Sequence, residues 1–178
     1  MPNYEIYPAD ILAALNVVDS NPFTPAPIDS TNYFLRKIGK KVEVVRHAEQ
    51  IGRISIGITA TTLYLGELHV DKRYRSLGVS NLLLFIALIY GIRKNALTVT
   101  LNEDSELEAY KFWARSGISI NHGTLSSIAS ALNHFEVYQS HLAQILNLYH
   151  TPRTMLLNTD VPAGAPTSGK KTSKEAWF

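Results

Sequence analysis

The sequence predicts an α/β (α+β) protein with a mixed, mostly antiparallel central sheet of about seven strands flanked by helices, plus an extra C-terminal helix and an extended tail. Three consecutive segments, 41–47, 52–59 and 62–70, alternate apolar and polar residues as half-buried strands do. Short turns separate them, which favours an antiparallel meander. From the strand over 62–70 to the segment 118–120, the predicted elements follow the order β-α-β-α-β.

The composition is that of one globular domain. The chain has 178 residues, 46% of them hydrophobic, which is enough to bury a single core. Seventeen Lys and Arg against fifteen Asp and Glu leave a net charge of +2, without the Lys/Arg stripe of a nucleic-acid binder. The chain has no cysteine, which excludes disulfides, thiolate nucleophiles and cysteine-based metal sites, and fits a reducing compartment. We expect no direct nucleic-acid partner.

The apolar segments are too short for a membrane span. The most apolar one, 82–92, has about eleven residues, whereas a spanning helix needs roughly 20. The N-terminus has no basic segment leading into an apolar one. The sequence therefore predicts a cytoplasmic protein without membrane contact.

Before the meander, the sequence predicts one strand and two helices. Residues 4–7 are typical of a short strand, and 9–18 carries apolar residues at helical spacing. Prolines break the chain over 22–27. The apolar residues of 33–38 then indicate a second short helix, which ends at Gly39.

After the meander, the sequence predicts two helices and three strands. A helix over 79–94 is apolar nearly all round and must be buried. A second helix over 105–116 is stopped by Gly117. The three strands are predicted over 96–101, 118–120 and 134–139.

The predicted organisation is a folded domain over 1–139, an additional helix over 140–150 and a low-complexity basic tail over 151–178. Pro, Gly, Ser and Thr are frequent in the tail, and its four basic and two acidic residues account for the whole net charge. Either the additional helix or a second subunit would cover the outer side of the apolar helix. Trp177 and Phe178 would be the anchors if the tail binds a partner.

The one chemical motif is Arg75-x-x-Gly78-x-Ser80, where a strand passes into a helix. The first turn of a helix leaves N–H donors unpaired and carries the positive end of the helix dipole, and a glycine lets a ligand approach the backbone. Such a loop suits a pyrophosphate. The alternative is that Gly78 only allows a tight turn while Arg75 is solvated.

The loop and the order of the elements resemble the GCN5-related N-acetyltransferase (GNAT) superfamily. The family signature, Arg or Gln-x-x-Gly-x-Gly or Ala after the fourth strand, reads RSLGVS here. LHVDKRYRSLGVSNLLL is similar to the family's strand, pyrophosphate loop and third helix, and EAYKFWARSGISI is similar to its fourth helix and following strand. The resemblance covers roughly residues 4–139 and implies a GNAT-like fold.

The resemblance also implies a ligand and its binding residues. Acetyl-CoA, or another acyl-CoA, would bind between two splayed strands, and Leu68 and Val70 would flank its pantetheine. The pyrophosphate would lie on the loop residues Arg75, Ser76, Leu77, Gly78, Val79 and Ser80. An amine of a small molecule or of a protein would then attack the thioester directly.

Three positions depart from the family pattern, and at one of them the family's frequent Asn before the fourth helix falls near Ser105 or Glu106. The tyrosine that often protonates the leaving thiolate falls on Trp113, whose indole cannot supply that proton. We therefore expect Trp113 to be a core or pocket-wall residue, with Tyr110 as a substitute only if the helix is rotated. Ser80 stands where the family has Gly or Ala, and its hydroxyl would either bind phosphate or crowd it.

Glu67 and His69 are the candidate catalytic residues. Alternation places them on one face of the strand that leads to the loop, opposite Leu68 and Val70. Such a pair can take a proton from an amine directly or through water, but an ordinary solvated strand face has the same pattern. The remaining histidines show no paired metal-binding spacing, so we expect no metal.

Two functions from different classes fit the sequence. The first is an acyl-CoA-dependent N-acyltransferase, with acetyl-CoA as the expected donor. The second is a non-catalytic GNAT-fold structural or adaptor subunit of a homo-oligomer or larger assembly, such as a phage virion, with the 140–178 segment on its partner. Trp113, the additional helix and the tail favour the second.

Overall fold

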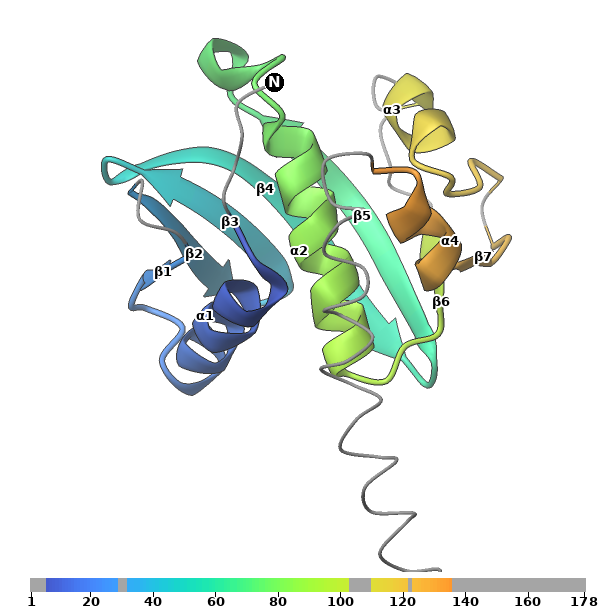
Figure 1. Ribbon diagram of the computed structural model, residues 1–178, viewed down its shortest axis with the longest axis horizontal. Helices are drawn as coiled ribbons and strands as arrows, with labels where there is room; N and C mark the ends of the chain where they lie inside the picture. The colour runs from blue at the N-terminus through green and yellow to red at the C-terminus, as the bar shows by residue number, and fades with distance from the viewer. Residues whose placement is uncertain (1–5, 29–31, 103–109, 122, 136–178) are drawn as a thin grey trace, which may run out of the picture.

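The computed structural model describes residues 6–28, 32–102, 110–121 and 123–135 (Figure 1). Within them the chain forms one seven-stranded sheet, with each strand beside the next in sequence. The strands are β1 (Ala26–Pro27), β2 (Tyr33–Ile38), β3 (Lys41–Arg46), β4 (Glu49–Thr59), β5 (Thr62–Val70), β6 (Thr98–Leu101) and β7 (Ser126–Ser127). The predicted fold class, a mixed and mostly antiparallel sheet with flanking helices, is confirmed.

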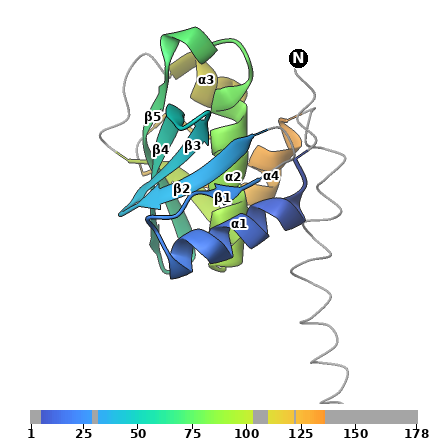
Figure 2. The same cartoon turned by 90° about the vertical axis from the view of Figure 1, so that its left-hand side faces the viewer.

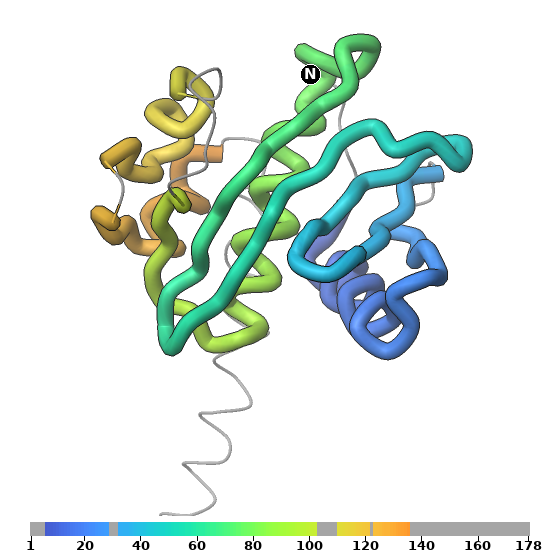
Figure 3. The backbone as a smooth tube through the Cα atoms, turned by 180° about the vertical axis from the view of Figure 1, so that it is seen from behind, coloured from blue at the N-terminus to red at the C-terminus, as the bar shows by residue number. Residues whose placement is uncertain are grey.

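One parallel pair interrupts the antiparallel sheet and opens a gap in it. β5 and β6 run parallel from Thr62 opposite Thr98 to Leu65 opposite Leu101, whereas all the other neighbouring strands are antiparallel. The N–H of Asn102 still donates to the Leu65 carbonyl at 2.7 Å. Beyond that bond β5 continues to Val70, whereas β6 has ended. The two segments of the chain therefore separate, as seen from behind in Figure 3.

The helices leave one sheet face open. α1 (Pro8–Ser20) and α2 (Val79–Arg93) pack on the same side of the sheet (Figure 2), and α4 (Ile128–Asn133) packs on α2. α3 (Tyr110–Arg115) lies near the diverging end of β5. No described helix crosses the opposite face of β2 to β5 (Figure 3), which we call the open face.

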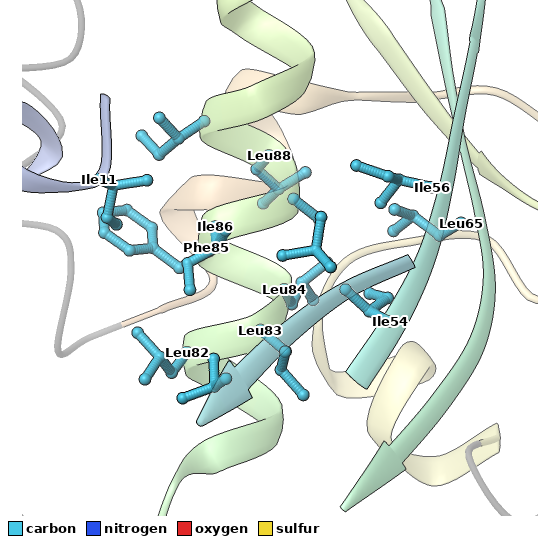
Figure 4. Close-up of a cluster of buried hydrophobic side chains, with 14 of the residues drawn as sticks. Ile11, Ile54, Ile56, Leu65, Leu82, Leu83, Leu84, Phe85, Ile86 and Leu88 are labelled. Atoms are coloured by element: carbon cyan, nitrogen blue, oxygen red, sulfur yellow. The ribbon is translucent and has the colours of Figure 1, made fainter. Parts of the chain in front are cut away.

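α2 is the centre of the core. All eight residues from Leu82 to Ile89 are buried, as predicted from the apolar character of this helix. Figure 4 shows Phe85 on the side of α1, near Ile11, and Leu88 on the side of the strands that carry Ile56 and Leu65. Because α1 and α4 both pack on α2, helices within the described residues cover part of its outer side.

Six predicted elements match closely and two are wrong; the helix over 79–94 is α2 and the strand over 96–101 is β6. The helix over 9–18 and the meander strands have nearly the predicted bounds. Residues 33–38 form β2 rather than a helix, because Gly39, at φ +58°, and Lys40 close a two-residue hairpin that pairs all six residues with β3. Residues 118–120 form no strand; β7 pairs with β6 instead, and the Ser119 N–H donates to Ser126 Oγ at 2.9 Å.

Several other expectations fall partly or wholly outside the described residues. One is the helix over 105–116, of which residues 110–116 are described and form α3 over Tyr110–Arg115. Another is the strand over 4–7, of which Ile6 and Tyr7 are described and do not belong to a strand. A third is the strand over 134–139, of which only the first two residues are described. The additional helix over 140–150 and the tail over 151–178 lie entirely outside. Among the described helices, none has the length and apolar character needed to cross a bilayer.

The junction of α1, β2 and α2 is held by Asp19, which supports a stability prediction. Its carboxylate accepts from Lys37 at 2.8 Å and from Arg93, while Lys94 is 3.6 Å away. Burial would raise the pKa of Asp19, but the hydrogen bonds from Lys37 and Arg93 outweigh it and lower this pKa to about 2. The ionised carboxylate therefore contributes stability above pH 3.8, which is lost as the pH falls towards 2.

We expect Asp19→Asn to lower the free energy of unfolding by about 1 kcal/mol at pH 7, since solvent screens a partly exposed pair. The deficit should shrink as the pH falls from 4 towards 2. Urea unfolding at pH 7, 4 and 3 measures it, with Glu49→Gln, which alters an exposed pair with Arg73, as the control. A deficit that is independent of pH would contradict this assignment.

Candidate functional site

The turn between β5 and α2 exposes a row of backbone donors. A 3-10 turn, η1 (Lys72–Tyr74), follows β5, and the Asp71 side chain accepts from the Arg73 N–H at 2.9 Å. Ser76, at φ +64°, and Gly78, at φ +82°, both adopt the left-handed conformation. Gly78 is the N-cap of α2 and its carbonyl accepts from the Leu82 N–H at 3.0 Å.

No side chain caps the N-terminus of α2. The N–H groups of Val79, Ser80 and Asn81 belong to the first helical turn and have no intrahelical acceptor. Within the described part of the chain they also make no other hydrogen bond. This end of α2 therefore offers convergent donors and the positive end of a 15-residue helix dipole.

A cavity of about 550 Å³ adjoins these donors. One wall is formed by Tyr74, Ser76, Gly78, Val79, Ser80 and Asn81. The opposite wall is formed by Phe112, Arg115 and Ser116 of the α3 region and by His134 and Phe135 after α4. The described walls contain one permanent cation, Arg115, and no carboxylate, so their electrostatics favour an anion.

α3 divides its residues between the core and this cavity. Trp113 is 1% exposed and lies in the core, and its ring makes an edge-on contact with Phe112 at 5.2 Å. The expectation that Trp113 is a core residue is confirmed. Its indole N–H has no hydrogen-bond partner among the described residues. Tyr110 is half exposed and is not among the described cavity walls.

The position of His134 depends on a glycine. Gly117 has φ +70°, and a Cβ added there would overlap the imidazole ring of His134. The ring therefore packs directly on the Gly117 backbone and is held at the cavity wall. Sequence reasoning did not identify His134 or Arg115, because they reach the loop only through the packing of α3 and α4.

The predicted binding residues are distributed unevenly around the cavity. Four of the loop residues line it: Ser76, Gly78, Val79 and Ser80. Leu77 is exposed, and Arg75 is turned back, with its Nε donating to the Val70 carbonyl at 3.2 Å. Leu68 and Val70 lie on the part of β5 beyond its pairing with β6, where Leu68 is half buried and Val70 is buried.

The face of Glu67 and His69 is set by a bulge. Between Ile54, opposite Leu68, and Ile56, opposite Leu65, two residues of β5 face only Ser55. This shifts the alternation, so that Glu67 and His69 share the open face. Arg53 supports that assignment, since it pairs with His69 across the strands and bonds to Glu67.

Glu67 is held by two cations. Arg53 donates to its Oε1 through Nε at 3.0 Å and through a second guanidinium N–H, and Lys41 donates to its Oε2 at 3.1 Å. The hydrogen bonds from Arg53 and Lys41 lower the pKa of Glu67, and the bond from Arg53 has the larger effect. The carboxylate is therefore ionised but already satisfied. The His69 side chain is exposed, and its imidazole makes no hydrogen bond to another described residue.

The described residues contain no cluster of three or more His, Asp or Glu side chains suited to a metal ion. The uncapped start of α2 and the cavity beside it offer anion binding by backbone amides and Arg115 on one side of the β5/β6 gap. Titratable groups stand on the open face on the other side.

Comparison with known proteins gives structural matches only. Protein-family models and curated proteins return no match. The similar solved structures include a proposed streptothricin acetyltransferase from Bacillus anthracis in complex with acetyl coenzyme A, at 24% identity and a TM-score of 0.38. They also include Ard1 from Thermoplasma volcanium, at 19% and 0.39, and a GNAT-family acetyltransferase from Staphylococcus aureus, at 18% and 0.39.

These matches are partial. The match to the Bacillus anthracis protein covers 49% of this chain and 48% of that one. The match to Ard1 covers 64% and 79%, and the match to the Staphylococcus aureus protein covers 62% and 77%. The chain thus spans about half of the length of the first of them.

Proposed function

We propose that the protein is an acyl-CoA-dependent N-acyltransferase, with acetyl-CoA as donor, that acylates an amine of a small molecule or a protein by direct attack. The observation that carries the proposal is the cavity at the start of α2. Uncapped N–H groups and Arg115 converge on it, and its described walls hold no carboxylate. A diphosphate is the ligand group that such donors recognise best.

Two groups of described residues support the proposal of such a donor, one for its diphosphate and one for its pantetheine arm. The backbone of residues 75–80 would hold the diphosphate, and Arg115 would face it from the opposite wall. The segment of β5 that carries Leu68 and Val70 leaves β6 at this point, so its backbone would flank an extended pantetheine arm. Acetyl-CoA supplies an acyl group activated as a thioester, and the chain binds and orients it.

The two open-face residues would divide the handling of the amine proton. His69 is the better base, because it is exposed and unbonded among the described residues, whereas two cations hold Glu67 and lower its pKa. Three residues of strand, about 10 Å, separate His69 from Gly66 at the gap, so His69 would act through water. Glu67 would keep Lys41 and Arg53 in place as a positioning residue.

We expect Arg115→Ala to weaken acetyl-CoA binding about tenfold without unfolding the protein, because it removes a charge-assisted hydrogen bond to phosphate. Lys111→Ala is the matched control: Lys111 precedes Arg115 by one turn of α3, and the Lys111 contact with Arg115 Nε uses only its backbone carbonyl. Titration calorimetry with acetyl-CoA measures both. Equal affinities for the two variants would remove Arg115 from the site.

A further inference from the structure

A second, smaller cavity of about 250 Å³ lies where β5 and β6 part. Gly66 and Asn102, which directly follow the last paired residues of the two strands, line it together with Lys40, Ser55 and Tyr64. An acyl group that reached through the gap from the diphosphate cavity would emerge here. An acceptor amine would therefore meet the acyl group in this cavity.

The cavity opens on the open face of the sheet. An added Cβ on Gly91 of α2 would contact Leu63, so Leu63 faces the helices and Tyr64 faces the other way. Tyr64 is 37% exposed, in agreement with that side. Donor and acceptor would thus approach the gap from different sides, and the residues around this cavity would select the acceptor.

Lys40 is the one charged residue among the described walls of the cavity. Its Nζ has no ion-pair partner in the described part of the chain, although eight ion pairs are present there. Its backbone is fixed, because the Lys40 carbonyl accepts from the Ile56 N–H at 2.7 Å. An uncompensated cation is therefore held at the rim.

The surrounding open face is also positive. Arg53 and Lys41 both bond to the single carboxylate of Glu67, and Arg36 bonds to Glu43 at 2.6 Å. With Lys40, four cations stand against two carboxylates, and both carboxylates are already paired. A polycationic acceptor would find repulsion here, whereas an anionic group would find a partner.

We infer that the acceptor is a small amine that also carries a carboxylate, as an amino acid does, and that Lys40 binds this carboxylate. The inference rests on the proposed function, because it concerns the second substrate of that reaction. The cavity volume suits a molecule of amino-acid size. The polar groups of Ser55 and Tyr64 are hydrogen-bonding partners for the rest of such a molecule.

The same charges help the reaction. An amine reacts only after its ammonium form has lost a proton, and nearby cations lower the pKa of an ammonium group. The nitrogen then forms the C–N bond to the acyl carbon, and the C–S bond breaks with its electron pair leaving on sulfur. The ammonium proton passes through water to His69, and the second proton, which the nitrogen loses as the amide forms, passes through water to the thiolate sulfur. The positive face thereby reduces the need for an unpaired carboxylate base.

The test is a panel of amino acids, each assayed beside the amine that lacks its carboxylate, with spermidine as a cationic acceptor. Thiol release at saturating acetyl-CoA gives kcat and KM. We expect the wild type to prefer the carboxylate-bearing member of each pair at least tenfold. Lys40→Arg should retain this preference. Lys40→Gln should raise KM for the amino acids about tenfold with little change in kcat. Lys40→Glu should reverse the preference, so that the amine without a carboxylate becomes the better acceptor.

The outcomes separate the two proposals. Acylation of amines without regard to a carboxylate, or a preference that Lys40→Glu leaves unchanged, would overturn the inference while the acyltransferase function stands. Failure to acylate any amine would overturn the proposed function and the inference with it.

Discussion

Replacing Gly78 by aspartate is expected to weaken acetyl-CoA binding by about 100-fold or more. Gly78 is the N-cap of α2 and lines the cavity where the proposed function places the diphosphate. A carboxylate there would repel a diphosphate: two unit charges about 4 Å apart repel by roughly 4 kcal/mol near a protein surface. It would also accept hydrogen bonds from the first-turn N–H groups that the ligand needs.

Gly78→Asn is the matched control for this variant. Asparagine has nearly the same shape, tolerates the left-handed conformation at φ +82° and caps the helix without adding charge. Both substitutions place a side chain of similar size at the same left-handed position and should change the melting temperature alike. A difference in calorimetric affinity would therefore report charge rather than unfolding. Equal affinities for the two variants would mean that no anionic group lies at Gly78.

Replacing Phe85 by alanine is expected to lower the free energy of unfolding by about 3–5 kcal/mol. Phe85 is fully buried in the middle of α2, which is packed by α1, the sheet and α4. The substitution removes a large apolar surface and leaves a cavity that neighbours on several elements cannot close together. In a protein of this size, each kcal/mol lost from the free energy of unfolding lowers the melting temperature by about 2–4 °C. We therefore expect the melting temperature to fall by roughly 10 °C.

Leu97→Ala is the control for the core variant, since Leu97 is 68% exposed and should change stability by less than about 0.5 kcal/mol. Denaturant unfolding of the two variants gives the comparison. If Phe85→Ala cost less than 1 kcal/mol, the assigned packing of α2 would be wrong. The same helix presents the diphosphate loop, so its rigidity bears directly on the site.

The fold could be predicted where a single physical pattern was unambiguous. A helix that is apolar all round has to be buried, and residues 82–89 are. The helix predicted over 33–38 is wrong, because the apolar Tyr33 and Leu35 also fit one face of a strand. The hairpin at Gly39 and Lys40 makes this segment a strand, because it pairs all six of its residues with residues of β3. β7 has only two residues and carries no periodicity to recognise.

The site could be predicted only on the side that one continuous segment forms. The loop from Ser76 to Ser80 is local, and its donors follow from the start of a helix. Arg115 and His134 lie on separate elements, and nothing in their spacing relates them to the loop. Likewise, the Lys41 and Arg53 contacts of Glu67 arise from strand register and a bulge, which sequence alternation alone does not reveal.

The central claim is that an acyl-CoA binds with its diphosphate at the start of α2. It is tested most directly by adding acetyl-CoA to ¹⁵N-labelled protein and following the backbone amide signals by NMR. The account predicts saturable shifts that are largest for residues 76–81, with smaller ones along 66–70. Unchanged spectra at millimolar acetyl-CoA, or saturable shifts confined to other parts of the molecule, would contradict it.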